Sequence, residues 1–184
     1  MRPNEKTRTV AMKPSMKAAK TEHTAPEIMP ITMSPSRQYT LEAFPARLTV
    51  SSLQAMRELA AELALHVRRG DVIAVEGPLG SGKTAFVGGL AQALVGGDPV
   101  TSPTFTFWHR YGSAETRLEH LDLYRLEDEA DLAELGLEEA FSPLCITVVE
   151  WPERAPSLVG VPTWRVQISG SGDSPREVTI RAGA

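Results

Sequence analysis

The chain has 184 residues, of which 42% are hydrophobic and 23% charged, a composition typical of a single soluble globular domain. No apolar stretch approaches the roughly 18 residues that a membrane-spanning helix needs, which argues against a membrane protein. The only cysteine, Cys145, excludes a disulfide framework and favours a reducing compartment, so we expect a cytoplasmic location.

Charge divides the chain into two parts. The whole chain holds 19 Lys and Arg and 23 Asp and Glu, a net charge of −4. Residues 1–38 contain 7 of the basic and 3 of the acidic residues, which leaves 12 basic and 20 acidic residues, a net charge of −8, for residues 39–184. An acidic body disfavours contact with a nucleic-acid backbone. We therefore expect no DNA binding, and RNA contact only through protein partners.

Residues 1–38 also differ from the rest in their pattern. They contain five prolines and no apolar periodicity of 2 or 3.6 residues, which predicts a disordered tail. They lack the apolar core of a secretory signal. Their basic, acid-poor composition leaves an organelle transit peptide as an alternative, although the prolines would break the amphipathic helix of such a peptide. We expect residues 39–184 to form the one folded domain.

The first predicted helix follows the serines at 51–52, either of which can cap it. Apolar side chains recur on one face from Leu53 to Val67, and we expect the helix to end at Gly70, with two arginines in its last turn. The apolar run at 72–75 then predicts a buried parallel strand.

The next segment fits a phosphate-binding loop. It reads Gly77-Pro78-Leu79-Gly80-Ser81-Gly82-Lys83-Thr84, which matches G-x-x-x-x-G-K-[ST], and a helix is predicted after it over residues 84–94. Glycines let the backbone turn its N–H groups towards a polyphosphate, and the positive end of the helix adds to the attraction. The Lys83 ammonium would reach the terminal phosphates, and the Thr84 hydroxyl would bind the accompanying Mg²⁺.

Beyond residue 100 the pattern predicts an α/β fold. We expect strands over 104–109, 117–123 and 145–149, a helix over 128–141 interrupted by Gly136, and an antiparallel hairpin of 163–169 with 177–181. Together with the strand before the loop, these elements predict a P-loop NTPase-like single domain. Its sheet would be mainly parallel with antiparallel additions, including the C-terminal hairpin.

Two carboxylates are candidates for binding the metal and orienting a water molecule. Glu150 directly follows the apolar run 145–149, where a strand end would lift it towards the phosphates. Asp122 lies between apolar neighbours in a predicted strand. The pattern favours Glu150 because its strand is more plainly buried, and it leaves both residues open. His120 is predicted to be structural or hydrogen-bonding rather than a metal ligand, and Trp151 to be either core or a wall of the ligand site.

Four motifs follow one another along the chain. They are the phosphate loop, then Thr101-Ser102-Pro103-Thr104-Phe105-Thr106, then His120-Leu121-Asp122-Leu123-Tyr124-Arg125-Leu126, and finally Val149-Glu150-Trp151-Pro152-Glu153. In order and spacing they resemble the TsaE (YjeE) family, from about Leu48 to the end of the chain. Pro78 departs from the family, which commonly has an aspartate there.

The resemblance implies an ATPase that uses Mg²⁺ and hydrolyses ATP slowly on its own. It implies Lys83, Asp122 and Glu150 as catalytic residues, and Thr84 with the same two carboxylates as metal ligands. The implied nucleotide-binding residues are Gly77, Leu79, Gly80, Ser81, Gly82, Lys83, Thr84, Ala85, Thr104 and Trp151. Segment 102–106 would act as a switch near the γ-phosphate, and segments 51–54 and 170–176 would approach the nucleotide.

The resemblance also implies a pathway. The family supports the TsaB–TsaD pair, which transfers a threonylcarbamoyl group to an adenosine beside the tRNA anticodon. TsaD-like and TsaB-like proteins would be the partners, and tRNA would be contacted only indirectly through the complex. Two alternatives stay open. One is a small-molecule kinase that clamps phosphate with Arg110, Arg117 and Arg125. The other is a non-enzymatic nucleotide-dependent switch, although the N-K-x-D segment that reads guanine is absent.

Overall fold

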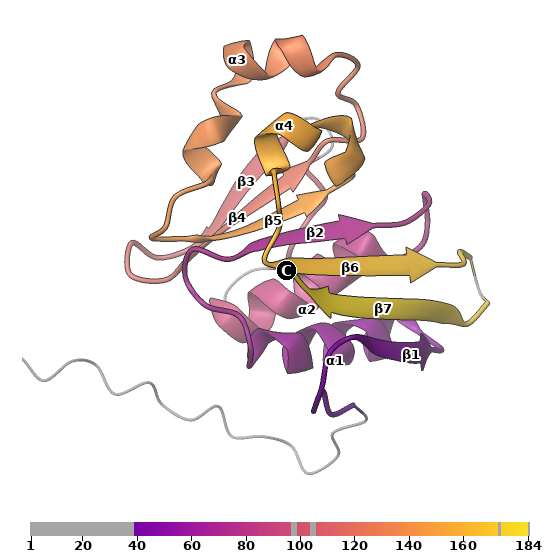
Figure 1. Ribbon diagram of the computed structural model, residues 1–184. Coiled ribbons are helices and arrows are strands. Elements are labelled where there is room, and N and C mark those ends of the chain that lie inside the picture. Colours follow the sequence, from indigo (N-terminus) through magenta and orange to yellow (C-terminus); the bar gives the residue numbers. More distant parts are fainter. Residues whose placement is uncertain (1–38, 97–98, 104–105, 173, 184) are drawn as a thin grey trace, which may run out of the picture. The chain divides into compact units, whose positions relative to one another are not determined.

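A mixed sheet of seven strands runs through the described residues, which are 39–183 without 97–98, 104–105 and 173 (Figure 1). The computed structural model orders the strands β1-β7-β6-β2-β5-β4-β3. Their bounds are β1 Ala46–Val50, β2 Val72–Glu76, β3 Trp108–Gly112, β4 Arg117–Asp122, β5 Ile146–Glu150, β6 Trp164–Ser169 and β7 Arg176–Ala182. The tail predicted at 1–38 lies outside the described residues, so its disorder and the domain boundary stay predictions.

The sheet combines a parallel centre with antiparallel edges. Strand β2 pairs in parallel with both β5 and β6, and β4 pairs in parallel with β5. Strands β3, β7 and β1 are added antiparallel, and β6 with β7 forms the C-terminal hairpin. The predicted fold class and the mixed sheet are confirmed. Parallel strands direct their carboxyl ends to one edge of the sheet, and the phosphate loop leaves β2 at that edge.

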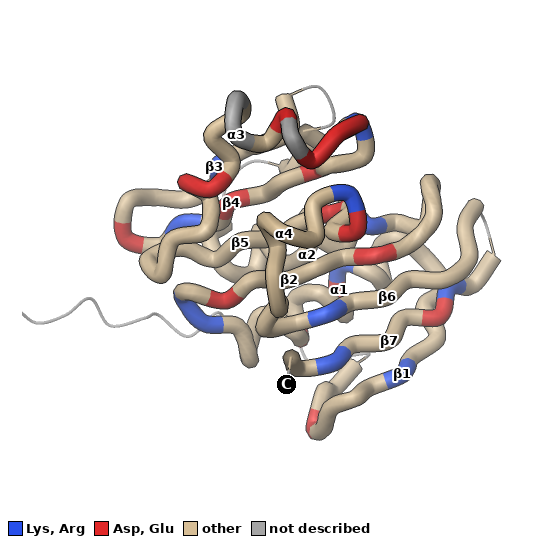
Figure 2. The backbone as a smooth tube through the Cα atoms, turned by 45° about the horizontal axis from the view of Figure 1, so that its top comes forward, with Lys and Arg blue, Asp and Glu red and all other residues tan. Residues whose placement is uncertain are grey.

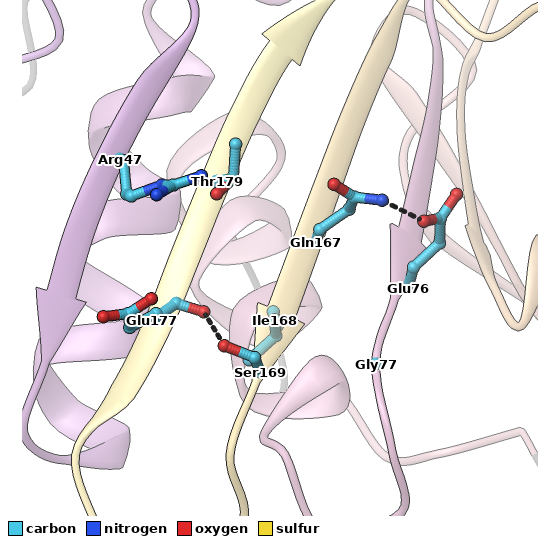
Figure 3. A pocket seen from close by; sticks show the side chains of 8 residues that line it. All are labelled: Arg47, Glu76, Gly77, Gln167, Ile168, Ser169, Glu177 and Thr179. Carbon is cyan, nitrogen blue, oxygen red and sulfur yellow. Dashed lines mark hydrogen bonds between the residues drawn. The ribbon is translucent and has the colours of Figure 1, made fainter.

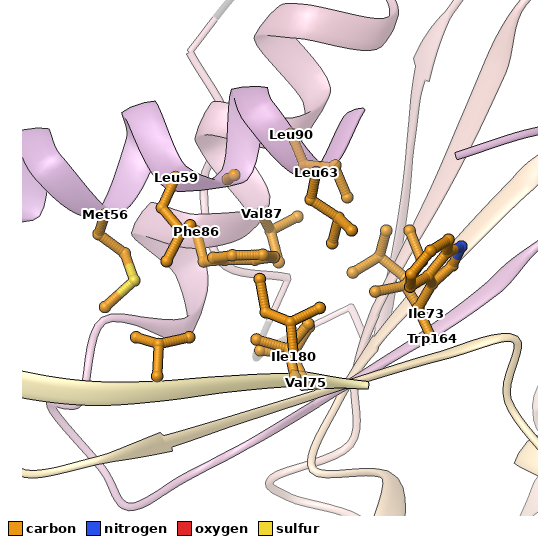
Figure 4. Packing of buried hydrophobic residues seen from close by; sticks show 14 of the residues in the cluster. Met56, Leu59, Leu63, Ile73, Val75, Phe86, Val87, Leu90, Trp164 and Ile180 are labelled. Carbon is orange, nitrogen blue, oxygen red and sulfur yellow. The ribbon is translucent and has the colours of Figure 1, made fainter. Parts of the chain in front are cut away.

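Two helices of twelve residues each cover one face of the sheet (Figure 1). Helix α1 spans Leu53–Ala64, and α2 spans Lys83–Leu94. Figure 4 shows their apolar side chains packed on the strands; it labels Met56, Leu59 and Leu63 of α1, Phe86, Val87 and Leu90 of α2, and Ile73, Val75, Trp164 and Ile180 of the sheet. Burial of each large apolar side chain contributes roughly 1.5–3 kcal/mol, so this cluster anchors the helix that begins at the phosphate loop.

Short helical segments form a second apolar cluster beside β4 and β5. They are η1 Glu129–Asp131, α3 Leu132–Leu135, η2 Leu137–Ala140, η3 Pro152–Arg154 and α4 Pro156–Val159. The helix predicted over 128–141 is therefore broken into pieces, and the break at Gly136 has a φ of 61°, a conformation that suits glycine. None of the helices within the described ranges is long and apolar enough to cross a membrane.

The end of the first helix differs from the prediction. It ends at Ala64 rather than at Gly70. The backbone N–H of His66 bonds to the carbonyl three residues earlier at 2.9 Å, and its ring packs edge-on against Phe44 at 5.3 Å between ring centroids. These contacts turn the chain out of the helix. The predicted start is confirmed, because Ser52 Oγ accepts the N–H of Ala55 at 3.0 Å.

Two strands also differ from the prediction. Of the strand expected over 104–109, residues 104–105 lie outside the described residues, and the described strand begins at Trp108 and continues to Gly112. Phe107 has a φ of 61°, which no extended strand residue adopts. Strand β1 was not predicted, because its five residues show only weak alternation and it depends on pairing with β7.

Acidic side chains gather on the segment that leads from β4 into α3, as Figure 2 shows. Four carboxylates stand within five residues there: Glu127, Asp128, Glu129 and Asp131. Part of the acidic excess predicted for the body is therefore concentrated close in sequence to Asp122. Such a surface repels a phosphate backbone.

Candidate nucleotide site

The loop between β2 and α2 is shaped by its glycines. Gly77, Gly80 and Gly82 have φ values of 151°, 76° and 100°. A Cβ atom on Gly77 would lie 2.5 Å from the carbonyl oxygen of Ile168 and 2.9 Å from Ser81 Oγ, so no side chain fits there. The backbone must therefore bend as the G-x-x-x-x-G-K-T spacing predicts, and α2 begins at Lys83 with its N-terminus at the loop.

The Lys83 side chain lies across this loop. Its Nζ donates to the carbonyl oxygens of Gly77 at 2.7 Å and of Pro78 at 3.0 Å, and it stands 3.8 Å from the centre of the Trp151 ring. Burial lowers the pKa of the ammonium, although the nearby carboxylates, Glu150 first among them, act to raise it. Burial removes water from the ammonium, and phosphate oxygens would replace that lost solvation.

Trp151 and Tyr124 form an aromatic pair beside Lys83. Trp151 follows β5 with a φ of 59°, an unusual value for a residue other than glycine. Its ring lies 5.0 Å from the ring of Tyr124, measured between centroids. Trp151 is half-buried and packs against the second apolar cluster, so both interpretations of its ring, core and wall of the ligand site, stay open.

The two candidate carboxylates meet at the same edge of the sheet. Asp122 and Glu150 end the neighbouring parallel strands β4 and β5 and are register partners. Both are buried. Thr84 Oγ1 donates to Glu150 at 3.0 Å from Oε1 and 3.2 Å from Oε2. Asp122 accepts the Ser102 hydroxyl at 2.6 Å and the N–H of Tyr124 at 3.1 Å. The structure thus brings the predicted acids to the first turn of α2.

The chemistry of these groups fits a magnesium ion held jointly with phosphate. Thr84, Asp122 and Glu150 offer oxygen atoms, which Mg²⁺ prefers, and this ion usually keeps several ligands from water and phosphate. Within the described ranges, no group of three or more His, Cys, Asp and Glu side chains could hold a metal. The protein part of the site is therefore too small for a metal held by side chains alone.

Arg176 is a site residue that the sequence pattern did not mark individually. It is buried, its Nη2 donates to the Gly172 carbonyl at 2.5 Å, and its Nε has no hydrogen-bond partner among the described residues. That Nε lies 3.6 Å from the position of a Cβ on Gly82, and Leu53 Cδ2 lies 3.3 Å from the same position. The segments 51–54 and 170–176 therefore both reach the phosphate loop, as expected.

Other predicted residues have mixed outcomes. Leu79 is 69% exposed at the tip of the loop, Ala85 is half-buried on α2, and Thr104 lies outside the described residues. His120 is hydrogen-bonded, as predicted, because its Nε2 lies 2.9 Å from Glu150 Oε1. The role of each residue in nucleotide binding stays a prediction.

Two of the three arginines that the kinase alternative would use are paired with a carboxylate instead. Arg110 Nε lies 3.0 Å and Arg117 Nε 2.6 Å from Oε1 of Glu119, whose side chain is fully buried. Side chains alternate along a strand, so Glu119 faces away from the side that carries His120 and Asp122. This pairing weakens the kinase alternative.

A separate hollow of about 460 Å³ lies on the sheet beside the phosphate loop (Figure 3). It is lined by Arg47, Glu76, Gly77, Gln167, Ile168, Ser169, Glu177 and Thr179. Gln167 donates to Glu76 at 2.9 Å, and Arg165 forms an ion pair with the same carboxylate. The hollow shares only Gly77 with the loop and carries both signs of charge, so it does not extend the phosphate site.

Comparison with known proteins gives a consistent result. The family model "Threonylcarbamoyl adenosine biosynthesis protein TsaE" matches residues 50–178. The tRNA threonylcarbamoyladenosine biosynthesis protein TsaE of Bacillus subtilis is 38% identical over 119 residues, which are 65% of this chain and 74% of that protein. The protein of the same name from Rickettsia conorii is 31% identical over 72% of this chain and 75% of its own length.

A solved structure agrees with these matches. The crystal structure of YdiB from Bacillus subtilis superposes with a TM-score of 0.63 at 28% sequence identity. The superposition covers 76% of this chain and 86% of that one.

Proposed function

This chain belongs to the TsaE family and to tRNA threonylcarbamoyladenosine biosynthesis, and from that premise we propose that it is a Mg²⁺-dependent ATPase. In this proposal it acts in the cytoplasm, hydrolyses ATP slowly alone, and supports TsaD-like and TsaB-like partners, which bring it only indirectly to tRNA.

Nucleotide binding is supported by the positive groups that lie at the phosphate loop. Lys83 would exchange two neutral carbonyl partners for charged phosphate oxygens, and charge-assisted hydrogen bonds are about twice as strong as neutral ones. The N-terminus of α2 adds its positive end, and the unpartnered Nε of Arg176 stands beside Gly82. The phosphates of ATP would therefore lie near three positive groups, which are the Lys83 ammonium, the N-terminus of α2 and the Arg176 guanidinium.

Hydrolysis is supported by the oxygen atoms around Thr84. A bound Mg²⁺ would neutralise charge that develops on the phosphates. Thr84, Asp122 and Glu150 would hold the ion, and the carboxylates would orient the attacking water. The Thr84 hydroxyl could keep its donated hydrogen bond to Glu150 and offer a lone pair of its oxygen to the ion.

Dependence on a partner fits the pairing of two arginines that could otherwise have served phosphate. P-loop enzymes often need an arginine supplied by another protein to stabilise the transition state. Arg110 and Arg117 are held by Glu119. We therefore expect slow turnover by the isolated chain and faster turnover in the complex.

The convergence of Lys83, Thr84, Asp122 and Glu150 from three elements carries the proposal. The test measures ATP turnover of the full chain with and without a TsaB–TsaD-type complex, and threonylcarbamoyladenosine in tRNA after deletion of the gene. We expect activation by the complex and loss of the modification. Complementation by wild type but not by Lys83→Ala supports the role of ATP, and full complementation by Lys83→Ala would contradict it.

A further inference from the structure

We propose that His120 is a positioning residue, which holds the Glu150 carboxylate in place for metal binding. This inference rests on the proposed Mg-ATP site. His120 lies on β4, two residues before Asp122, and its side chain is fully buried. Its Nε2 lies 2.9 Å from Glu150 Oε1.

The hydrogen bond assigns a proton to one ring nitrogen. An ionised carboxylate only accepts hydrogen bonds, so Nε2 must carry the hydrogen and donate it. The other nitrogen, Nδ1, is buried and has no hydrogen-bond partner among the described residues. His120 therefore makes its one polar contact in the described structure with Glu150.

Glu150 depends on few donors. Its two oxygen atoms accept from Thr84 Oγ1 and from His120 Nε2 among the described residues. The threonine oxygen would also be a ligand of the cation, whereas His120 would serve only to hold Glu150. A hydrogen bond at Oε1 restricts rotation of the carboxylate, which would keep the group oriented for a metal. Residues that orient a metal ligand in this way commonly change metal affinity by 10–100-fold when they are removed.

A role in packing alone is the competing explanation. His120 contacts the core, and its ring lies 6.3 Å from the ring of Tyr111, measured between centroids. An apolar side chain would serve packing equally well, and it would avoid an unpartnered Nδ1 in the interior, where such a group is costly. The two explanations differ in whether a replacement must donate a hydrogen bond.

The experiment compares the full chain with the variants His120→Gln and His120→Leu. The Gln amide can donate from nearly the same position as Nε2, and Leu cannot. Mn²⁺ replaces Mg²⁺ as the probe, and electron paramagnetic resonance follows free Mn²⁺ at saturating ADP. The affinity for ADP without metal is measured alongside, and a urea midpoint checks the folding of each variant.

We expect His120→Leu to weaken Mn²⁺ binding about tenfold or more. His120→Gln should recover most of that loss, and ADP binding without metal should be the same in all three proteins. Unchanged Mn²⁺ binding in His120→Leu would overturn the proposal. So would an equal loss in a folded His120→Gln, because the ring rather than the donor would then matter.

A second readout does not need a nucleotide. In the ¹⁵N spectrum of the metal-free wild-type protein, His120 should show a hydrogen on Nε2. The opposite tautomer would overturn the proposal even if Mn²⁺ and ADP bind normally. Failure of the wild type to take up Mn²⁺ with ADP would instead refute the proposed nucleotide function, and with it the metal-positioning role.

Discussion

Two buried carboxylates on neighbouring strands have opposite surroundings. Glu119 on β4 accepts hydrogen bonds from Arg110 Nε and from the indole N–H of Trp108, at 2.7 Å, and it forms an ion pair with Arg117. Glu150 at the end of β5 receives a hydroxyl and an imidazole, with no arginine. Glu119 is already compensated by two guanidinium groups. Glu150 has no guanidinium partner among the described residues and could still bind a metal cation, so we interpret Glu119 as a structural acid and propose Glu150 as a functional one.

The largest effect should come from removing the negative charge of Glu150. Glu150→Gln keeps the size and polarity of the side chain but not its charge. We expect the ATP turnover rate to fall about 10²–10³-fold, because transition-state charge is no longer stabilised through the metal. Nucleotide binding should persist. Single-turnover kinetics at saturating Mg-ATP measure the rate, and wild-type turnover in this variant would remove Glu150 from the mechanism.

The next effect concerns binding rather than turnover. Lys83→Ala should weaken Mg-ATP binding roughly 100-fold, which at about 1.4 kcal/mol per factor of ten is close to 3 kcal/mol. The reason is that the Lys83 ammonium, which lies across the loop at Gly77 and Pro78, would be lost as a charged donor to the phosphates. Isothermal titration calorimetry gives the affinity. Lys83→Arg is the matched control, because it keeps the positive charge but replaces the compact ammonium with a planar guanidinium. Its affinity for Mg-ATP should lie between those of the wild type and Lys83→Ala.

The same kind of change at Glu119 should affect stability instead. Glu119→Gln leaves two arginines without their counter-charge, and we expect the free energy of unfolding to fall by roughly 2 kcal/mol. Urea denaturation measures it. ATP affinity should be unchanged, because Glu119 faces away from Asp122. A loss of ATP binding in a stably folded Glu119→Gln protein would contradict the assignment of Glu119 as a structural acid.

The smallest effect should come from removing the Ser102 hydroxyl, which donates a hydrogen bond to Asp122. Ser102→Ala removes the donor that lies 2.6 Å from Asp122 Oδ2. One such hydrogen bond contributes about 1 kcal/mol, so the Mg²⁺ concentration at half-maximal ATPase rate should rise about fivefold. Ser102→Thr should keep most of the wild-type value. Equal Mg²⁺ dependence in Ser102→Ala and wild type would show that Asp122 needs no such support.

The phosphate loop could be predicted from sequence because its causes are local. The φ values of Gly77, Gly80 and Gly82 follow from which residues lack a side chain, and the strand and helix on either side are contiguous with them. The meeting of Asp122 with Glu150 was predictable for a different reason. Each lies in or directly after a predicted strand, and the carboxyl ends of parallel strands share an edge.

The features that sequence did not predict depend on distant partners. Val67 continues the apolar period of α1, yet the helix stops at Ala64, because His66 packs against Phe44 and lies near Trp164, almost a hundred residues later. Arg176 gives no signal in its own segment, and it becomes a site residue only because the C-terminal hairpin places it beside Gly82. Such contacts need the order of the strands, which no local pattern contains.

The central claim is that the bent loop with Lys83, Thr84 and the two strand-end acids takes up ATP together with Mg²⁺. Calorimetric titration of Mg-ATP into the purified full chain tests it directly. The account predicts saturable binding with a Kd of about 1 mM or tighter, weakened when EDTA removes the metal and lost in Lys83→Ala. Absence of any uptake at millimolar Mg-ATP by the folded wild-type protein would contradict it.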